Sequence, residues 1–300
     1  MIRQHIAIVT LAAFALVACG TGPGSGDASD GSAASTQDIA IAGSGPFEDC
    51  YQQAAFGTDL PVPGVERELF VIIDQTTPMP SALVESLSRK VAEYLAGGSA
   101  KITVASFSAN TASNFATVNF TGEAQGPVDE SKRNDLNARK LAQLETCLAQ
   151  MPGKLAARTD AEMRALVSTD GGSFASSEIL GSLTALSEAV LVSQARDKTV
   201  LVVSDMLEHS STTSFYADKS IRDFDVGAEL QKAVDRRQLG DFGGAKVYVM
   251  GAGLLPPDSD AAATRDAAQL YTLKNFWQNW FENSNASLAG FGQPELISSL

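Results

Sequence analysis

An almost unbroken apolar run, ELFVIID, occupies residues 68–74 and constrains the fold more than any other feature of the sequence. A run without polar alternation is typical of a central strand that is covered on both faces, as in a parallel sheet. A second such run, KTVLVVSD, occupies residues 198–205 and also ends on an aspartate. Parallel strands need crossover connections, which are usually helices. The two runs therefore predict an α/β fold with a mostly parallel sheet.

Strand and helix signals alternate along the rest of the domain, whose core is expected at about residues 66–285. The TVNFT segment at 117–121 alternates in polarity and follows the strand expected at 101–106 closely, so it is expected to pair antiparallel with that strand at the edge of the sheet. We expect a three-layer fold with helices on both faces of the sheet. Further strands are expected at 245–251 and 287–290, and helices at 80–95, 131–150, 160–167, 176–196, 226–238 and 264–283.

The N-terminus has the layout of a secretory signal, with Arg3 followed by an apolar segment at residues 6–17 and small residues before Cys19. The apolar segment is too short to span a bilayer permanently. Residues 16–19, LVAC, resemble the lipobox of bacterial lipoproteins, in which the cysteine becomes the lipidated first residue of the mature chain. The resemblance implies a signal peptide at residues 1–18. The alternative is an ordinary cleaved signal in which Cys19 is incidental.

Residues 20–45 contain mainly Gly, Ser, Ala and Asp, and this composition cannot bury enough apolar surface to order itself. We expect residues 19–45 to be a disordered tether and residues 46–300 to be the folded domain. The lipobox resemblance also bears on location, because Gly20 is not the aspartate linked with inner-membrane retention in lipoproteins of enteric-type bacteria. It favours the outer membrane, facing the periplasm, if the cell is Gram-negative.

The chain has 300 residues and a formal net charge of −13, with 35 acidic and 22 basic side chains. This charge argues against nucleic acid or an anionic membrane surface as the partner, because both would repel it. Without Cys19 two cysteines remain, Cys50 and Cys147, which could form one disulfide after export. The alternative is a pair of buried free thiols.

Asp74 and Asp205 each follow a buried strand, and the carboxyl ends of the strands form the ligand crevice of an open α/β sheet. Two carboxylates that meet there repel each other unless a cation or hydrogen-bond donors lie between them. Mg²⁺ or a similar hard ion suits ligands that are all oxygen. The glycine-rich turn at 169–173 precedes the long helix at 176–196 and could add a hydroxyl group.

The order of these elements and motifs resembles the von Willebrand factor type A domain over residues 66–285. The resemblance implies a metal ion-dependent adhesion site for Mg²⁺ or Mn²⁺ and a protein partner that binds there. By position, its ligands are Asp74, Thr76, Ser173 and Asp205.

Two residues depart from the family pattern. Pro78 stands where the second serine is expected, and Met206 where a glycine usually follows the last aspartate. Thr77 is one position away and could turn inward only with a changed loop. A site with one ligand fewer is expected to bind metal weakly. The alternative is that Asp74 and Asp205 accept backbone N–H groups of their own turns.

We expect a membrane-anchored protein-interaction module and assign no catalytic residue. One alternative is a metal-assisted hydrolase that uses Asp74, Asp205 and His209, and another is a structural domain with an inert site. The chain has no Gly-x-Ser-x-Gly elbow, no Walker lysine and no zinc-ligand spacing.

Aromatic residues are densest at 276–281, FWQNWF, on the last predicted helix. Trp277 and Trp280 either pack against the sheet or form an exposed patch for a partner. His209 lies in the polar loop after Asp205, on the presumed ligand face, and is a further candidate for partner binding.

Overall fold

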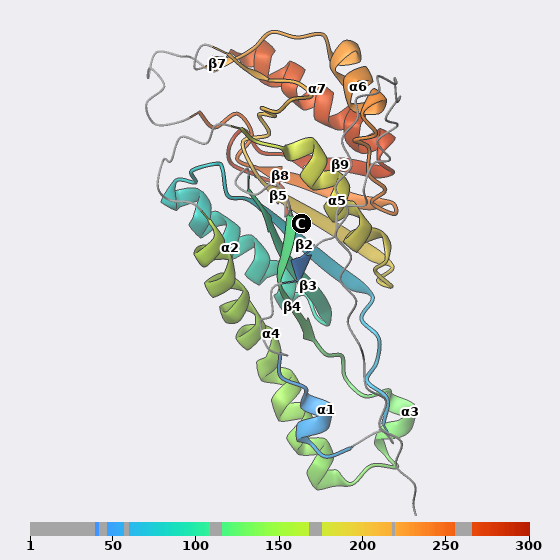
Figure 1. Cartoon of the computed structure of the whole chain (residues 1–300). Coiled ribbons are helices and arrows are strands. Elements are labelled where there is room, and N and C mark those ends of the chain that lie inside the picture. Colours follow the sequence, from blue (N-terminus) through green and yellow to red (C-terminus); the bar gives the residue numbers. More distant parts are fainter. Residues whose placement is uncertain are drawn as a thin grey trace, which may run out of the picture. The chain divides into compact units, whose positions relative to one another are not determined.

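The computed structural model describes residues 40–41, 47–56, 60–108, 116–167, 176–217, 220–255 and 266–300. In these residues a seven-stranded sheet has the order β1-β4-β3-β2-β5-β8-β9 (Figure 1). Its strands are β1 (Ala40–Ile41), β2 (Arg67–Asp74), β3 (Ala100–Phe107), β4 (Ala116–Ala124), β5 (Asp197–Val203), β8 (Ala245–Met250) and β9 (Ala286–Phe291).

Strand β2 lies at the point where the order of the strands reverses. It pairs in parallel with β3 on one side and with β5 on the other. Strands β5, β8 and β9 are also parallel, whereas β4 is antiparallel to β3, as its alternating sequence predicts. The chain thus builds outward from β2 through β3 to β4 and then returns to β5. Ligand crevices of open α/β sheets form at the carboxyl ends of strands at such a reversal.

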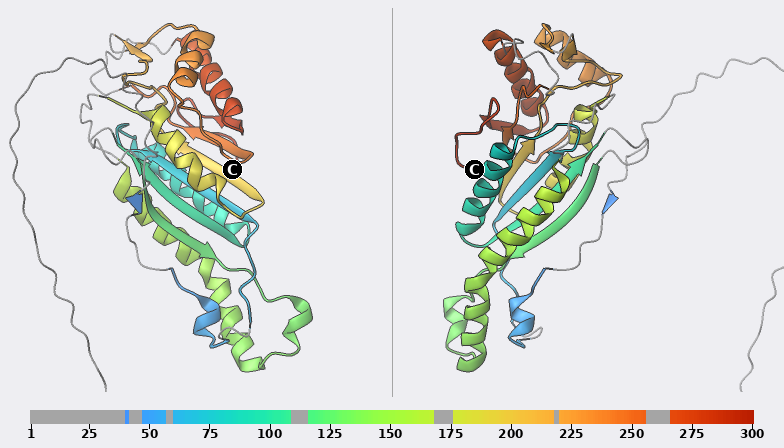
Figure 2. Two further views of the ribbon diagram at one scale, coloured as in Figure 1. Left: turned by 45° about the vertical axis from the view of Figure 1, so that its right-hand side comes forward. Right: turned by 90° about the vertical axis from the view of Figure 1, so that its left-hand side faces the viewer.

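Helices cover both faces of the sheet, which confirms the predicted three-layer α/β fold (Figure 2). Along β2, Leu69, Val71 and Ile73 pack with α2 and α4, whereas Phe70 and Ile72 pack with α5 and α7. Both faces of the strand are therefore buried, as its unbroken apolar run predicts. The helices are α1 (Cys50–Gln53), α2 (Ser81–Ala96), α3 (Glu130–Arg133), α4 (Ala138–Leu166), α5 (Ile179–Leu191), α6 (Val226–Asp235) and α7 (Ala267–Asn283).

Helix α4 corrects the prediction of two helices at 131–150 and 160–167. It has 29 residues and continues through Pro152. A proline inside a helix removes one hydrogen bond and costs about 3 kcal/mol. The burial of apolar side chains before and after Pro152 in the helix offsets this cost. The residues that α4 buries are Leu144, Met151, Leu155, Thr159 and Met163.

Several short elements were not predicted from the sequence. They are α1, strand β1 and the hairpin of β6 (Tyr216–Ala217) and β7 (Ser220–Ile221). Strand β1 lies inside the range expected to be a disordered tether and pairs with β4, so β1 rather than the antiparallel β4 forms this edge of the sheet. Cys19, the signal peptide and residues 20–39 lie outside the described residues.

A disulfide joins Cys50 in α1 to Cys147 in α4, which confirms the bonded alternative for these cysteines. The two residues are 97 positions apart. Closing so long a loop contributes on the order of 4 to 5 kcal/mol in the chain-entropy account of disulfides. Among the described residues no helix is long and apolar enough to cross a membrane.

Candidate functional site

Asp74 and Asp205 come together at the carboxyl ends of β2 and β5, as the sequence predicts. Asp74 is the last residue of β2, and Asp205 follows the last residue of β5, Val203, by two positions. The two strands are adjacent and parallel, with Ile73 opposite Val203. The carboxyl groups therefore lie at the point where the strand order reverses.

The carboxylate of Asp74 is 1% exposed and accepts four hydrogen bonds. Its Oδ1 accepts from the backbone N–H of Thr76 at 2.8 Å and from the Thr76 hydroxyl at 2.5 Å. Its Oδ2 accepts from the hydroxyls of Thr77 at 3.1 Å and Ser204 at 2.7 Å. Three of the four donors are therefore side-chain hydroxyls rather than the backbone amides of a simple turn.

Thr77 takes the inward place that Pro78 cannot fill. The Thr77 side chain is 1% exposed, and its Oγ1 also accepts a hydrogen bond from the Asp205 N–H at 3.2 Å. It thus links the loop after β2 to the loop after β5. From the sequence, Thr77 was expected to turn inward only if the loop changed its shape. The sequence alone does not decide this orientation, because it depends on a contact with Asp205, which is 128 positions away.

Ser204 was missed as a site residue, although a hydroxyl directly before Asp205 is visible in the sequence LVVSD. It is fully buried, and its Oγ accepts the N–H of Met206 at 2.9 Å while it donates to Asp74. One hydroxyl therefore joins the end of β2 to the loop after β5.

The two carboxyl groups have raised pKa values. Burial raises the pKa of Asp74, and the hydrogen bonds from Thr76, Ser204 and Thr77 oppose that shift. Burial, followed by the negative charge of Asp74, raises the pKa of Asp205 well above its usual range. No cation of the described chain is among the causes of either shift. A proton or an added cation would therefore relieve the repulsion between the two groups.

Thr76 and Ser177 form a hydroxyl pair beside this carboxylate, with 3.0 Å between their Oγ atoms. A hydroxyl has one proton to donate, and Thr76 donates it to Asp74. The proton between Thr76 and Ser177 therefore comes from Ser177. Both side chains are only partly buried. Ser173, the hydroxyl predicted from the glycine-rich turn, lies outside the described residues.

Ser177 is held in place by the loop after β5. Its backbone N–H donates to the carbonyl of His209 at 2.8 Å, and the N–H of His209 donates back at 3.0 Å. Ser177 also lies before the first residue of α5, Ile179, rather than within the helix expected at 176–196. A serine just before a helix is the signal that could have indicated it.

The backbone at Met206, which stands where the resemblance expects a glycine, adopts the left-handed conformation. Its φ angle is +61°, which costs on the order of 1 kcal/mol or more for a residue other than glycine. The Met206 side chain is fully buried, and its carbonyl accepts the indole N–H of Trp277 at 2.9 Å. The carbonyl of Asp205 accepts the N–H of Gly253 at 2.8 Å. Packing and hydrogen bonds therefore hold the loop in this shape.

The two tryptophans of α7 are core residues. Trp277 and Trp280 are both 0% exposed, and the indole N–H of Trp280 donates to the carbonyl of Gln238 at 2.8 Å. They present no surface to a partner, so the alternative of an exposed aromatic patch is wrong for these side chains. The physical reason is that Phe242 and neighbouring core residues cover the second face of the helix as well.

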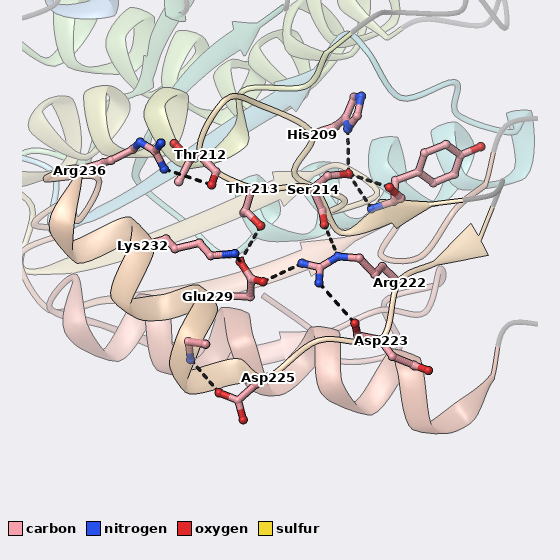
Figure 3. Close-up of polar contacts among 12 residues, drawn as sticks. His209, Thr212, Thr213, Ser214, Arg222, Asp223, Asp225, Glu229, Lys232 and Arg236 are labelled. Carbon is pink, nitrogen blue, oxygen red and sulfur yellow. Dashed lines mark hydrogen bonds and ion pairs between the residues drawn. The ribbon is translucent and has the colours of Figure 1, made fainter.

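His209 is exposed and contacts neither carboxyl group. Its Nδ1 lies 2.8 Å from the Ser214 hydroxyl. Figure 3 marks this contact with a dashed line. The following loop is tied to α6 by Glu229, which is 3% exposed and pairs with Arg222 at 2.7 Å and Lys232 at 2.8 Å. His209 is therefore positioned as a surface residue of an ordered loop rather than as an acid or base for Asp74 and Asp205.

The donor chemistry of the site fits a hard divalent cation. Among the described residues the site offers the partly buried hydroxyls of Thr76 and Ser177 and the half-buried carboxylate of Asp205, all of which are oxygen groups. Oxygen-only ligands of this kind suit Mg²⁺ or Mn²⁺. In the described part of the chain no group of three or more His, Cys, Asp or Glu side chains is placed to hold a metal. Hydroxyl groups and water would therefore have to supply most of the ligands.

No protein-family model matches the chain, and no curated protein sequence matches it. One similar solved structure is the crystal structure of an aerotolerance-related membrane protein from Bacteroides fragilis NCTC 9343 with multiple mutations to serines. The two chains are 14% identical, the match covers 75% of this chain and 90% of that chain, and the TM-score is 0.29.

Proposed function

We propose that this chain is a membrane-anchored envelope protein whose α/β domain binds a protein partner at the carboxyl edge of β2 and β5. The observation that carries the proposal is the convergence of Asp74 and Asp205 with the hydroxyls of Thr76 and Ser177 at the reversal of strand order. This edge is where open α/β sheets bind ligands.

The hydroxyl pair gives the edge its binding chemistry. Because Thr76 donates its proton to Asp74 and Ser177 donates to Thr76, both oxygens keep lone pairs for a ligand. A bound Mg²⁺ or Mn²⁺ would offset the charge of the two carboxylates and attract an acidic group of the partner. Thr77 and Ser204 keep the two loops together, so the partner would meet a preformed surface.

The membrane anchor in this proposal is a lipid on Cys19, and the favoured location is the periplasmic face of an outer membrane. The support is the LVAC sequence at residues 16–19 together with the short apolar segment before it. The acidic charge of the chain fits an anchor that is a lipid rather than a basic surface patch.

Calorimetric titration with Mg²⁺ and with Mn²⁺ tests the binding chemistry. We expect binding at millimolar metal, and we expect Asp205→Asn to lower the affinity at least about tenfold because a charged ligand is lost. Asp235→Asn is the matched control, since Asp235 lies on α6 and bonds Gln231. An absence of binding in the wild type, or an equal effect of both variants, would contradict a metal-dependent site.

A further inference from the structure

Glu208 is a fully buried carboxyl group that the binding chemistry above does not use. It is 0% exposed, and its Oε2 accepts the backbone N–H of Leu180 in the first turn of α5 at 2.8 Å. Its Oε1 has no hydrogen-bond partner among the described residues. The N-cap residue of α5, Glu178, makes no side-chain capping bond. Glu208 therefore serves as the cap of α5 from a segment 28 positions away.

This contact lies next to the bonds that position the hydroxyl pair. The residue after Glu208, His209, makes the two backbone hydrogen bonds to Ser177, whose hydroxyl lies 3.0 Å from that of Thr76. The carbonyl of Glu208 accepts the N–H of Phe215 at 2.8 Å. The loop after β5 is thus attached to α5 by the Glu208 carboxyl and by the adjoining backbone bridge.

The surroundings of Glu208 favour its neutral form. A buried ionised carboxylate with one oxygen left without a donor is costly, whereas the neutral acid is much less so. Burial raises the pKa of Glu208 to about 8, and the charge of Glu178 adds to the shift, whereas hydrogen bonding from the Ser210 hydroxyl and from the Leu180 and Ile179 backbone opposes it. Glu178 is the charged group that faces it from α5, and the segment 210–215 carries no titratable side chain. The other titratable side chains of its own loop have partners of their own, since His209 bonds Ser214 and Asp205 accepts the N–H of Leu207.

We propose that Glu208 is a positioning residue whose neutral carboxyl closes the loop after β5 onto α5, and that its ionisation opens this contact. The inference rests on the proposed function only in its consequence for binding, because the closed loop keeps Ser177 opposite Thr76. Opening the loop would separate the two hydroxyls and weaken binding at the carboxyl edge.

The direction of the pH effect follows from proton linkage. The folded protein keeps a proton on Glu208 at pH values where the unfolded chain has released it. The closed loop is therefore most stable at pH values below the ordinary pKa of glutamate, and it loses stability as the pH rises through about 8. Glu208→Gln keeps the size and the acceptor oxygen but has no charge to gain.

Nuclear magnetic resonance of the indole N–H of Trp277 reports the loop without any added metal, because this group donates to Met206 in the same loop. In the wild type we expect its resonance to shift with a midpoint near pH 8. Protection of the Leu180 amide against hydrogen exchange should fall about tenfold once the pH is one unit above the midpoint. The Trp280→Phe variant removes one of the two indole N–H signals and so identifies the signal of Trp277.

Two variants make the test specific. Glu208→Gln should abolish both changes, whereas Glu178→Gln, a matched loss of one neighbouring charge, should keep them and move the midpoint to lower pH. A wild type without either change, or a Glu208→Gln variant that keeps them, would overturn the role of Glu208. A pH-dependent loop in a protein that binds neither Mg²⁺ nor Mn²⁺ would support Glu208 and refute the metal-dependent function.

Discussion

At the scale of single residues, Asp74 is defined by the hydroxyl groups around it. Thr76, Thr77 and Ser204 all donate to its carboxylate, so the missing hydroxyl at Pro78 is replaced by the residue before it. Each such hydrogen bond to a charged group contributes on the order of 1.5 to 3 kcal/mol. The loop after β2 is therefore ordered by the carboxylate whether or not a metal binds.

Ser177→Ala tests which hydroxyl completes the exposed side of the site. We expect Mn²⁺ affinity to fall about tenfold, because one oxygen ligand and the hydrogen bond to Thr76 are lost. The neighbouring variant Ser176→Ala is the matched control and should bind as the wild type does. Calorimetric titration of the two variants measures the difference. Equal affinities would show that Ser177 is not a ligand. Ser173 would then be the candidate for the hydroxyl ligand from this segment.

At the scale of elements, α4 shows how burial overrides a local break signal. The Pro152-Gly153 pair favours the end of a helix, yet Leu155 beyond it is fully buried against β4. Ending the helix at Pro152 would expose the apolar side chains that follow, and each buried leucine contributes about 1.5 to 3 kcal/mol. The continuous helix is therefore favoured despite the lost hydrogen bond.

A pair of glycine substitutions tests this packing. A Cβ at Gly153 would meet no atom within 4 Å, so Gly153→Ala should stabilise the domain by about 1 kcal/mol through helix propensity. A Cβ at Gly122 in β4 would lie 2.5 Å from Leu155 Cδ1 and 2.8 Å from Phe120 Cζ. Gly122→Ala should therefore destabilise it by about 1 to 3 kcal/mol. Urea unfolding measures the change in the free energy of unfolding for both variants. If α4 packs against β4 as described, the two changes must have opposite signs.

At the scale of the whole molecule, the strand order explains why the two aspartates meet. They are 131 positions apart in the chain, but β2 and β5 are neighbours because the chain returns to the centre of the sheet after β4. The Cys50–Cys147 disulfide attaches α1, the first described helix, to α4 on the same domain. It thereby anchors the N-terminal end of the described domain.

Cys19→Ser tests how the domain is attached to the cell. We expect the variant to leave the membrane fraction and to lack the mass of the lipid, because the thiol that carries the lipid is absent. Gly20→Asp is the companion variant, which should keep the lipid and move to the inner membrane in a cell with enteric-type sorting. Membrane fractionation with mass spectrometry measures both effects. Unchanged mass and location of Cys19→Ser would refute lipid anchoring at this residue.

Much of the fold could be read from the chain, because apolar runs and helical periods are local signals. The runs at 68–74 and 198–205 predicted the central parallel strands, and the alternation at 117–121 predicted the antiparallel one. The same runs placed Asp74 and Asp205 at the carboxyl edge. These predictions hold because both faces of a buried strand must be apolar, whatever the rest of the chain does.

The details of the site depend on contacts between segments that are far apart in the chain. The inward turn of Thr77 depends on Asp205, and the position of Ser177 depends on His209. In the sequence, Glu208 looks like an ordinary polar loop residue. Its burial depends on its contact with α5. A local sequence pattern does not indicate such partners, because the intrinsic secondary-structure propensity of a residue is the same whether or not its hydroxyl or carboxyl group finds a distant partner. Packing therefore selects which polar groups form the site, whereas the sequence pattern selects the sheet that brings them together.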